Sequence, residues 1–106
     1  MEKRRAIIEF NLSKLGIAPC LQGFWYIRRA IESQLESDIE KNILDIYKEF
    51  AEENGVGPGW IENSISYAIG KVDVDAYKEI GGYSLANADF ISTLALLVKN
   101  KLESEE

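Results

Sequence analysis

The stretch "GVGPGWIENSISYAI", from Gly55 to Ile69, predicts a sharp turn followed by a helix that buries one face. Its first five residues hold three glycines and one proline, and Pro58 suits the first turn of a helix. The apolar positions that follow recur at helical spacing, which predicts that they face the core. These positions are Ile61, Ile65, Ala68 and Ile69.

The outer face of this helix carries no cation, because the whole stretch lacks lysine, arginine and histidine. Helical geometry places four residues on that face. They are Glu62, Asn63, Ser66 and, at the margin, Tyr67. A glycine-rich loop can also bind phosphate, but a phosphate loop follows a strand or ends in Gly-Lys-Ser/Thr, and neither condition holds here. The segment is therefore interpreted as a connector between two helices.

Five further helices are expected on either side of this one. Apolar residues recur at spacings of three to four along each of them, and no useful length of chain alternates with the period of a strand. We expect helices at 2–15, 21–36, about 38–54, 60–71, 74–80 and 87–102, and a disordered tail at 103–106. The expected fold class is therefore all-α, a six-helix bundle-like domain at 1–102.

Polar residues and glycines mark the expected helix ends. Ser37 or Asp38 is expected to cap the third helix, whose apolar positions are Ile39, Ile43, Ile46 and Phe50. Asp73 and Asn87 are expected to cap the fifth and sixth helices. Gly23 costs about 1 kcal/mol against alanine inside a helix. The second helix therefore either begins after Gly23 or packs its backbone closely against a neighbour there.

Charge and composition narrow the classes of function. The chain has 106 residues and a formal net charge of −6, so its average surface repels nucleic acid and anionic lipid. No apolar run reaches the length of about 20 residues that crosses a bilayer, so we expect no membrane association. The single cysteine, Cys20, is expected in the core, and a free thiol without a secretory leader fits the cytoplasm.

Catalysis is not expected from this composition. The sequence contains no histidine, which removes the usual acid–base triads and zinc sites, so we expect no enzyme, no cofactor and no metal. Four carboxylates flank the turn, and they are interpreted as solubilising surface charge rather than a hydrolytic pair. They are Glu49, Glu52, Glu53 and Glu62. The cluster "FWYIRRAI" is interpreted as core aromatics with solvated arginines, although such a mixture can stack on single-stranded bases.

Three stretches resemble the C-terminal effector domain of the stage-zero sporulation response regulator, the master transcription factor of sporulation. "LGIAPCLQGFWYIRRAI" resembles the opening signature of that family, "IYKEFAEENGVGPGWIENSISYAI" its helix-turn-helix and "NADFISTLALLVKNKL" its last helix. The matching positions in the opening signature are Gly16, Gly23, Tyr26, Arg28, Ala30 and Ile31. The resemblance implies a six-helix domain with a helix-turn-helix at about 44–71, which in the family binds a short DNA box and contacts RNA polymerase.

The departures from the family concern the residues that contact DNA. The family's recognition helix carries a glutamate followed by arginines and a histidine. Here Glu62 remains, whereas Asn63 and Ser66 stand at the arginine positions and Tyr67 at the histidine position. Two family lysines on the preceding helix are matched by Glu52 and Glu53.

These departures predict a regulatory domain that acts mainly through protein contacts, with weak or absent binding to duplex DNA. The expected partner is the transcription machinery or a second copy of the chain. The alternative is a sequence-specific transcription regulator that reads DNA with the altered outer face of Glu62, Asn63, Ser66 and Tyr67.

Overall fold

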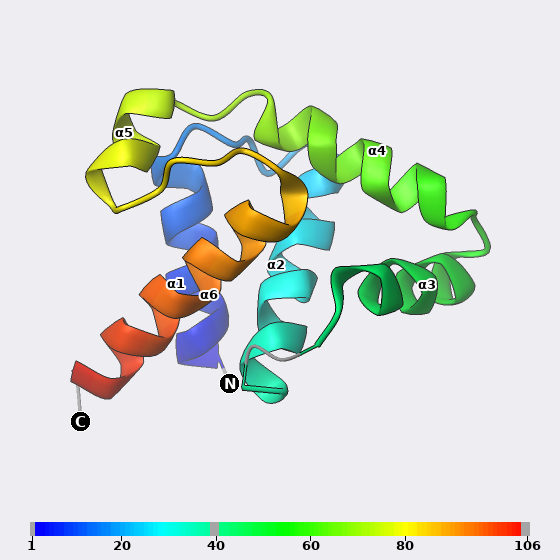
Figure 1. The fold of residues 1–106 in the computed structure, drawn as a ribbon, viewed down its shortest axis with the longest axis horizontal. Coiled ribbons are helices and arrows are strands. Elements are labelled where there is room, and N and C mark those ends of the chain that lie inside the picture. The colour runs from blue at the N-terminus through cyan, green and yellow to red at the C-terminus, as the bar shows by residue number, and fades with distance from the viewer. Residues whose placement is uncertain (1, 39–40, 105–106) are drawn as a thin grey trace.

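Six α-helices and no strand make up the part of the chain that the structure describes, which confirms the all-α prediction. The structure is a computed structural model that describes residues 2–38 and 41–104 (Figure 1). The helices are α1 (Glu2–Lys14), α2 (Gln22–Glu36), α3 (Ile43–Asn54), α4 (Pro58–Ile69), α5 (Val74–Glu79) and α6 (Asn87–Ser104).

The start of α3 differs from the prediction. Asn42 caps this helix, because its side-chain oxygen accepts a hydrogen bond of 2.7 Å from the backbone N–H of Leu44. Ser37 instead follows the end of α2 and donates its hydroxyl to the carbonyl of Gln34. Asp38 bonds Lys99 of α6, which lowers the pKa of the Asp38 carboxyl. The predicted caps, Ser37 and Asp38, are therefore wrong, and Ile39 lies outside the described residues.

The turn between α3 and α4 forms at the predicted place. Gly55 adopts a left-handed φ of 66°, a conformation that glycine accepts without a steric penalty. α4 then begins at Pro58, two residues earlier than predicted, with proline in the first turn. Asp73 caps α5 as predicted, by accepting from the N–H of Ala76.

α6 is longer than predicted. It continues to Ser104 instead of ending at Leu102, so the first two residues of the expected disordered tail are helical. Residues 105–106 lie outside the described residues.

The core forms around α2, which packs against α1, α3, α4 and α6. Each of these helices contributes the apolar stripe that its sequence predicts. From α4 the buried residues are Ile61, Ile65, Ala68 and Ile69, all at most 2% exposed. Cys20 is an exception to the predictions: it lies exposed before α2 and is not a core residue.

α2 and α4 approach each other closely at Gly23. A Cβ atom at Gly23 would lie 2.1 Å from the carbonyl oxygen of Ser64 and 2.7 Å from the Cβ of Ala68. The sequence left open whether α2 begins after Gly23 or packs closely against a neighbour there, and the close packing is correct. The residue lies inside α2, where the missing side chain lets α4 contact the backbone.

Replacing Gly23 with alanine is expected to lower the free energy of unfolding by about 1 to 3 kcal/mol, because α4 must move away from α2. Urea unfolding measures this change. Gly59→Ala is the matched control, since nothing lies within 4 Å of a Cβ there. The control is expected to leave stability unchanged or raise it by up to about 1 kcal/mol. Equal stability of the Gly23→Ala variant and the natural chain would contradict the close packing.

Candidate functional site

The outer face of α4 is exposed as predicted. Glu62, Asn63 and Ser66 are all exposed, and Tyr67 is 60% exposed. Sequence reasoning missed that Trp60, one helical turn before Asn63, is 53% exposed on the same side. The sequence does indicate this position of Trp60. Trp60 precedes Tyr67 by seven residues, about two helical turns, so both aromatics lie on one stripe of the helix.

Lys71 lies at the end of this stripe. Its Nζ is 4.9 Å from the centre of the Tyr67 ring, a cation–π distance. Trp60, Asn63, Tyr67 and Lys71 together are called the α4 ridge below. The ridge offers apolar area at two aromatics and one positive charge at its C-terminal end.

A groove of about 450 Å³ lies beside the α4 ridge, between α3, α4 and the start of α6. Its walls are mainly apolar, and Leu44 and Leu85 are among the exposed large apolar residues of the protein. The α4 side of the groove consists of Glu62, Ser66, Ile69 and Gly70. The remaining lining residues are Ile43, Leu44, Tyr47, Leu85, Ala86, Asn87 and Ala88. The ridge and the groove therefore use different residues of α4.

Asn87 holds the three walls of the groove together. Its side-chain nitrogen donates to the hydroxyl of Tyr47 at 3.0 Å and to the carbonyl of Glu62 at 3.2 Å. Its side-chain oxygen accepts from the hydroxyl of Ser66 at 3.1 Å. Asn87 is therefore the first residue of α6 and not the predicted cap, because its side chain turns toward α3 and α4.

The Tyr47 hydroxyl stays protonated at neutral pH. Burial raises its pKa above the ordinary value, and the hydrogen bond from Asn87 acts in the opposite direction. The hydroxyl oxygen is therefore an acceptor for Asn87 throughout the physiological range.

The exposed side of α3 is acidic. It carries Asp45, Glu49, Glu52 and Glu53 against a single exposed cation, Lys48. Glu49 forms an ion pair with Lys41, and both oxygens of Glu53 accept hydrogen bonds from Arg29, at 2.9 and 3.1 Å. The guanidinium of Arg29 also lies 4.5 Å from the centre of the Phe50 ring. Glu53 is therefore an inter-helix contact as well as a surface charge.

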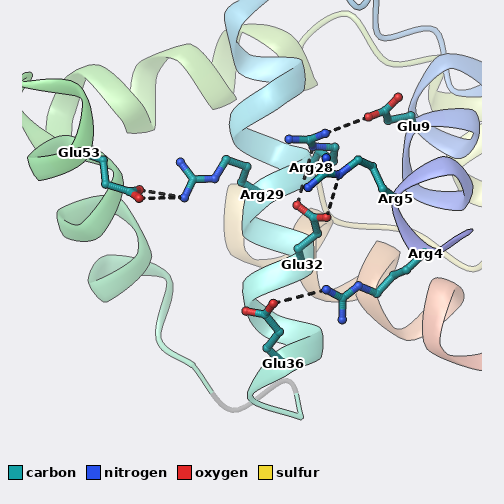
Figure 2. A network of polar contacts seen from close by, with 8 residues as sticks. All are labelled: Arg4, Arg5, Glu9, Arg28, Arg29, Glu32, Glu36 and Glu53. Atoms are coloured by element: carbon teal, nitrogen blue, oxygen red, sulfur yellow. Dashed lines mark hydrogen bonds and ion pairs between the residues drawn. The ribbon is translucent and has the colours of Figure 1, made fainter. Parts of the chain in front are cut away.

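All four arginines of the chain pair with carboxylates around α2 (Figure 2). Arg4 and Arg5 of α1 pair with Glu36 and Glu32 of α2. Arg28 of α2 reaches Glu9 of α1 at 3.0 Å. The expectation that the arginines of "FWYIRRAI" are solvated is therefore wrong for Arg28, whose side chain is 14% exposed, whereas Arg29 is 38% exposed and pairs with Glu53 at the surface.

The aromatics of the same cluster divide between core and surface. Phe24 and Tyr26 are buried, which fits the core interpretation, whereas Trp25 is 40% exposed. The guanidinium of Arg28 lies 5.3 Å from the centre of the Trp25 ring. This tryptophan therefore packs beside the ion pairs that join α1 to α2.

The described part of the chain shows neither a metal-binding cluster nor a membrane-spanning helix. Residues 2–38 and 41–104 contain no cluster of three metal-ligating side chains. Over the same residues, no helix has the length and apolar character that a membrane span requires.

A scan of the sequence against models of known protein families gives no match, and a search of curated proteins gives none either. The resemblance to the sporulation effector domain therefore stays a prediction from the quoted motifs.

Glu53→Lys is expected to lower the free energy of unfolding by up to about 1 kcal/mol, since it replaces a paired carboxylate with a cation beside Arg29. The expected change is small because Glu53 is half exposed. Glu52→Lys, which changes the same charge on the neighbouring residue, is the control and is expected to stay within about 0.5 kcal/mol. Urea unfolding at low and at high salt measures both. A difference that persists unchanged at high salt would contradict an electrostatic cause.

Asn87→Ala is expected to lower the free energy of unfolding by about 1 to 3 kcal/mol, because it leaves the buried hydroxyl of Tyr47 without its hydrogen-bond donor. Asn63→Ala, a change of the same residue type at an exposed site, is expected to be nearly neutral. The midpoints of thermal unfolding of the two variants, measured under the same conditions, test this expectation. Equal midpoints would show that Asn87 does not hold the groove walls together.

Proposed function

We propose that this chain is a non-enzymatic regulatory domain, of the kind that its motifs resemble, in which α3 and α4 form a helix-turn-helix that contacts protein. In this proposal the binding of duplex DNA is weak or lost. The observation that carries the proposal is the combination of an α4 that holds no lysine, arginine or histidine from Pro58 to Ile69 and four arginines that are all paired with carboxylates.

The charges around α4 disfavour DNA. A bidentate arginine on guanine is the commonest specific base contact and is worth about 1 to 3 kcal/mol of discrimination. Asn63 and Ser66 fill two such positions. Glu52 and Glu53 stand where the family that the motifs resemble has lysines, and the Glu53 carboxylate is paired with Arg29. The combined loss is comparable with the roughly 4 to 10 kcal/mol that separates specific from non-specific binding.

The aromatics of the α4 ridge favour a protein partner. Tryptophan and tyrosine are enriched at the energetically dominant positions of protein interfaces. Trp60 and Tyr67 are both more than half exposed, and the apolar groove lies beside them. Burial of these surfaces against a partner would remove apolar area from water.

One observation favours the alternative, a working DNA-binding regulator. Asn63 is exposed in the middle of the outer face of α4, and an asparagine amide can form two hydrogen bonds with adenine in the major groove. In that case Asn63 and Tyr67 would read bases without the help of an arginine.

Fluorescence anisotropy with labelled duplexes distinguishes the two functions. The natural chain is expected to bind a duplex carrying the family's DNA box, and a scrambled duplex, weakly and equally at physiological salt. The double variant Asn63→Arg, Glu52→Lys is expected to bind more tightly. Its logarithmic salt dependence should steepen by about 0.9 for each phosphate that the new cations neutralise.

Glu53 and Ser66 are kept in this variant because they bond Arg29 and Asn87. The matched control is Asn100→Arg, Glu103→Lys, which makes the same change of charge at exposed positions near the end of α6. Nanomolar binding of one duplex by the natural chain, with rejection of the scrambled one, would overturn the proposal.

A further inference from the structure

A second exposed apolar surface lies along α1, where this helix packs against α6 (Figure 1). Phe10 is 63% exposed there. Two adjoining hollows of about 340 and 150 Å³ open on this surface, and both are lined by Asn11 and Lys101. The surface is called the α1/α6 seam below, and it consists of Lys3, Ile7, Phe10, Lys14, Leu97 and Lys101.

The α1/α6 seam is positively charged, although the protein has a net charge of −6. Three lysines line the hollows, Lys3, Lys14 and Lys101, against one carboxylate, Glu79. In the described part of the chain neither Lys14 nor Lys101 forms an ion pair, whereas all four arginines do. An apolar stripe with cations at its edges is complementary to an apolar surface edged by anions.

The spacing along α1 sets the shape of the partner. Lys3, Ile7, Phe10 and Lys14 follow one another at intervals of four, three and four residues, so they lie on one stripe of the helix. The two lysines are therefore about 16 Å apart along the helix axis, at 1.5 Å per residue. A partner helix of about three turns spans this stripe, and its side chains repeat with the same period.

We propose that the α1/α6 seam binds an acidic amphipathic helix of another protein. The apolar face of that helix covers Phe10 and fills the two hollows, and its carboxylates pair with Lys14 and Lys101. Docking of an amphipathic helix in an apolar groove is a recurring mode of recognition. The inference goes beyond the proposed function, because it assigns a surface on α1 and α6 that does not depend on what α4 binds.

An anionic membrane fits the seam less well than a protein helix does. Surfaces that bind anionic lipid carry clusters of about four to eight cations, whereas three lysines line the hollows of the seam. A flat bilayer would also leave the hollows unfilled, and it would repel a protein with a net charge of −6.

Fluorescence anisotropy with a labelled peptide tests the proposal. The probe is a peptide of about 16 residues, long enough to form a helix, with leucines along one stripe and glutamates at the edges of that stripe. The control peptide has glutamine in place of each glutamate. The natural chain is expected to bind the glutamate peptide about threefold to tenfold more tightly, with a smaller preference at high salt. The net charge of −6 alone predicts the opposite order, since it repels the glutamate peptide.

The double variant Lys14→Glu, Lys101→Glu is expected to raise the dissociation constant of the glutamate peptide about tenfold or more. The matched control is Lys48→Glu, Lys71→Glu, which makes the same change of charge at exposed positions outside the seam. This control is expected to change the dissociation constant less than about twofold. Circular dichroism melting confirms that both double variants fold.

Phe10→Ala is expected to weaken binding of both peptides about fivefold or more, because it removes the aromatic ring at the centre of the seam. Tyr67→Ala is the matched control, since Tyr67 is 60% exposed and belongs to the α4 ridge. This control is expected to bind both peptides as the natural chain does.

The proposal is overturned if the glutamine peptide binds as tightly as the glutamate peptide, or if the variants at Lys14, Lys101 and Phe10 bind as the natural chain does. Vesicles of phosphatidylserine and phosphatidylcholine are expected to leave the chain in the supernatant after sedimentation. Co-sedimentation that the Lys14→Glu, Lys101→Glu variant abolishes would assign the seam to a membrane and overturn the proposal. Each of these failures would leave the proposed function of α4 standing, because that function is tested by the binding of duplex DNA.

Discussion

The contact between the backbone of α2 at Gly23 and the carbonyl of Ser64 on α4 determines how the rest of the protein is arranged. With no side chain at Gly23, α4 lies directly on α2 and turns Ile61, Ile65 and its other apolar residues into the core. The opposite side of α4 is then necessarily exposed. Because α3 precedes α4 by a short turn and α6 begins beside Ser66, the same contact also positions the walls of the groove.

Ion pairs around α2 decide the electrostatic character of this exposed face. Arg28 and Arg29 extend from α2 toward α1 and α3, where Glu9 and Glu53 neutralise them (Figure 2). The half-exposed pair of Arg29 and Glu53 contributes little stability, about 0.2 to 1 kcal/mol, whereas the Arg28 side chain is only 14% exposed. The larger effect of these ion pairs is on recognition, since a guanidinium held by two carboxylate oxygens is not free to bind guanine or phosphate. The carboxylates that remain on α3 leave the region beside α4 acidic.

The helices and the two sides of α4 could be predicted from the sequence, because burial imposes a period of 3.6 residues on apolar positions. This period placed Ile65 inside and Asn63 outside, as the structure has them. The N-cap of α3 could not be chosen in the same way, since Ser37, Asp38 and Asn42 are all good capping residues and only the path of the chain selects one. The Asn87 bridge and the groove depend on three separate helices, and local sequence carries no signal for such a meeting.

The apolar stripe of α4 and the glycine turn before it are requirements of the fold. Any chain with this core needs them, whatever its outer face binds. The pattern of turn and helix therefore indicates the architecture only, and the activity depends on the residues that face outward. Those residues favour a protein partner, because Trp60 and Tyr67 hold apolar area in water without contributing to the core. An interface recovers that hydrophobic free energy by covering the rings, whereas a polar phosphate backbone would not.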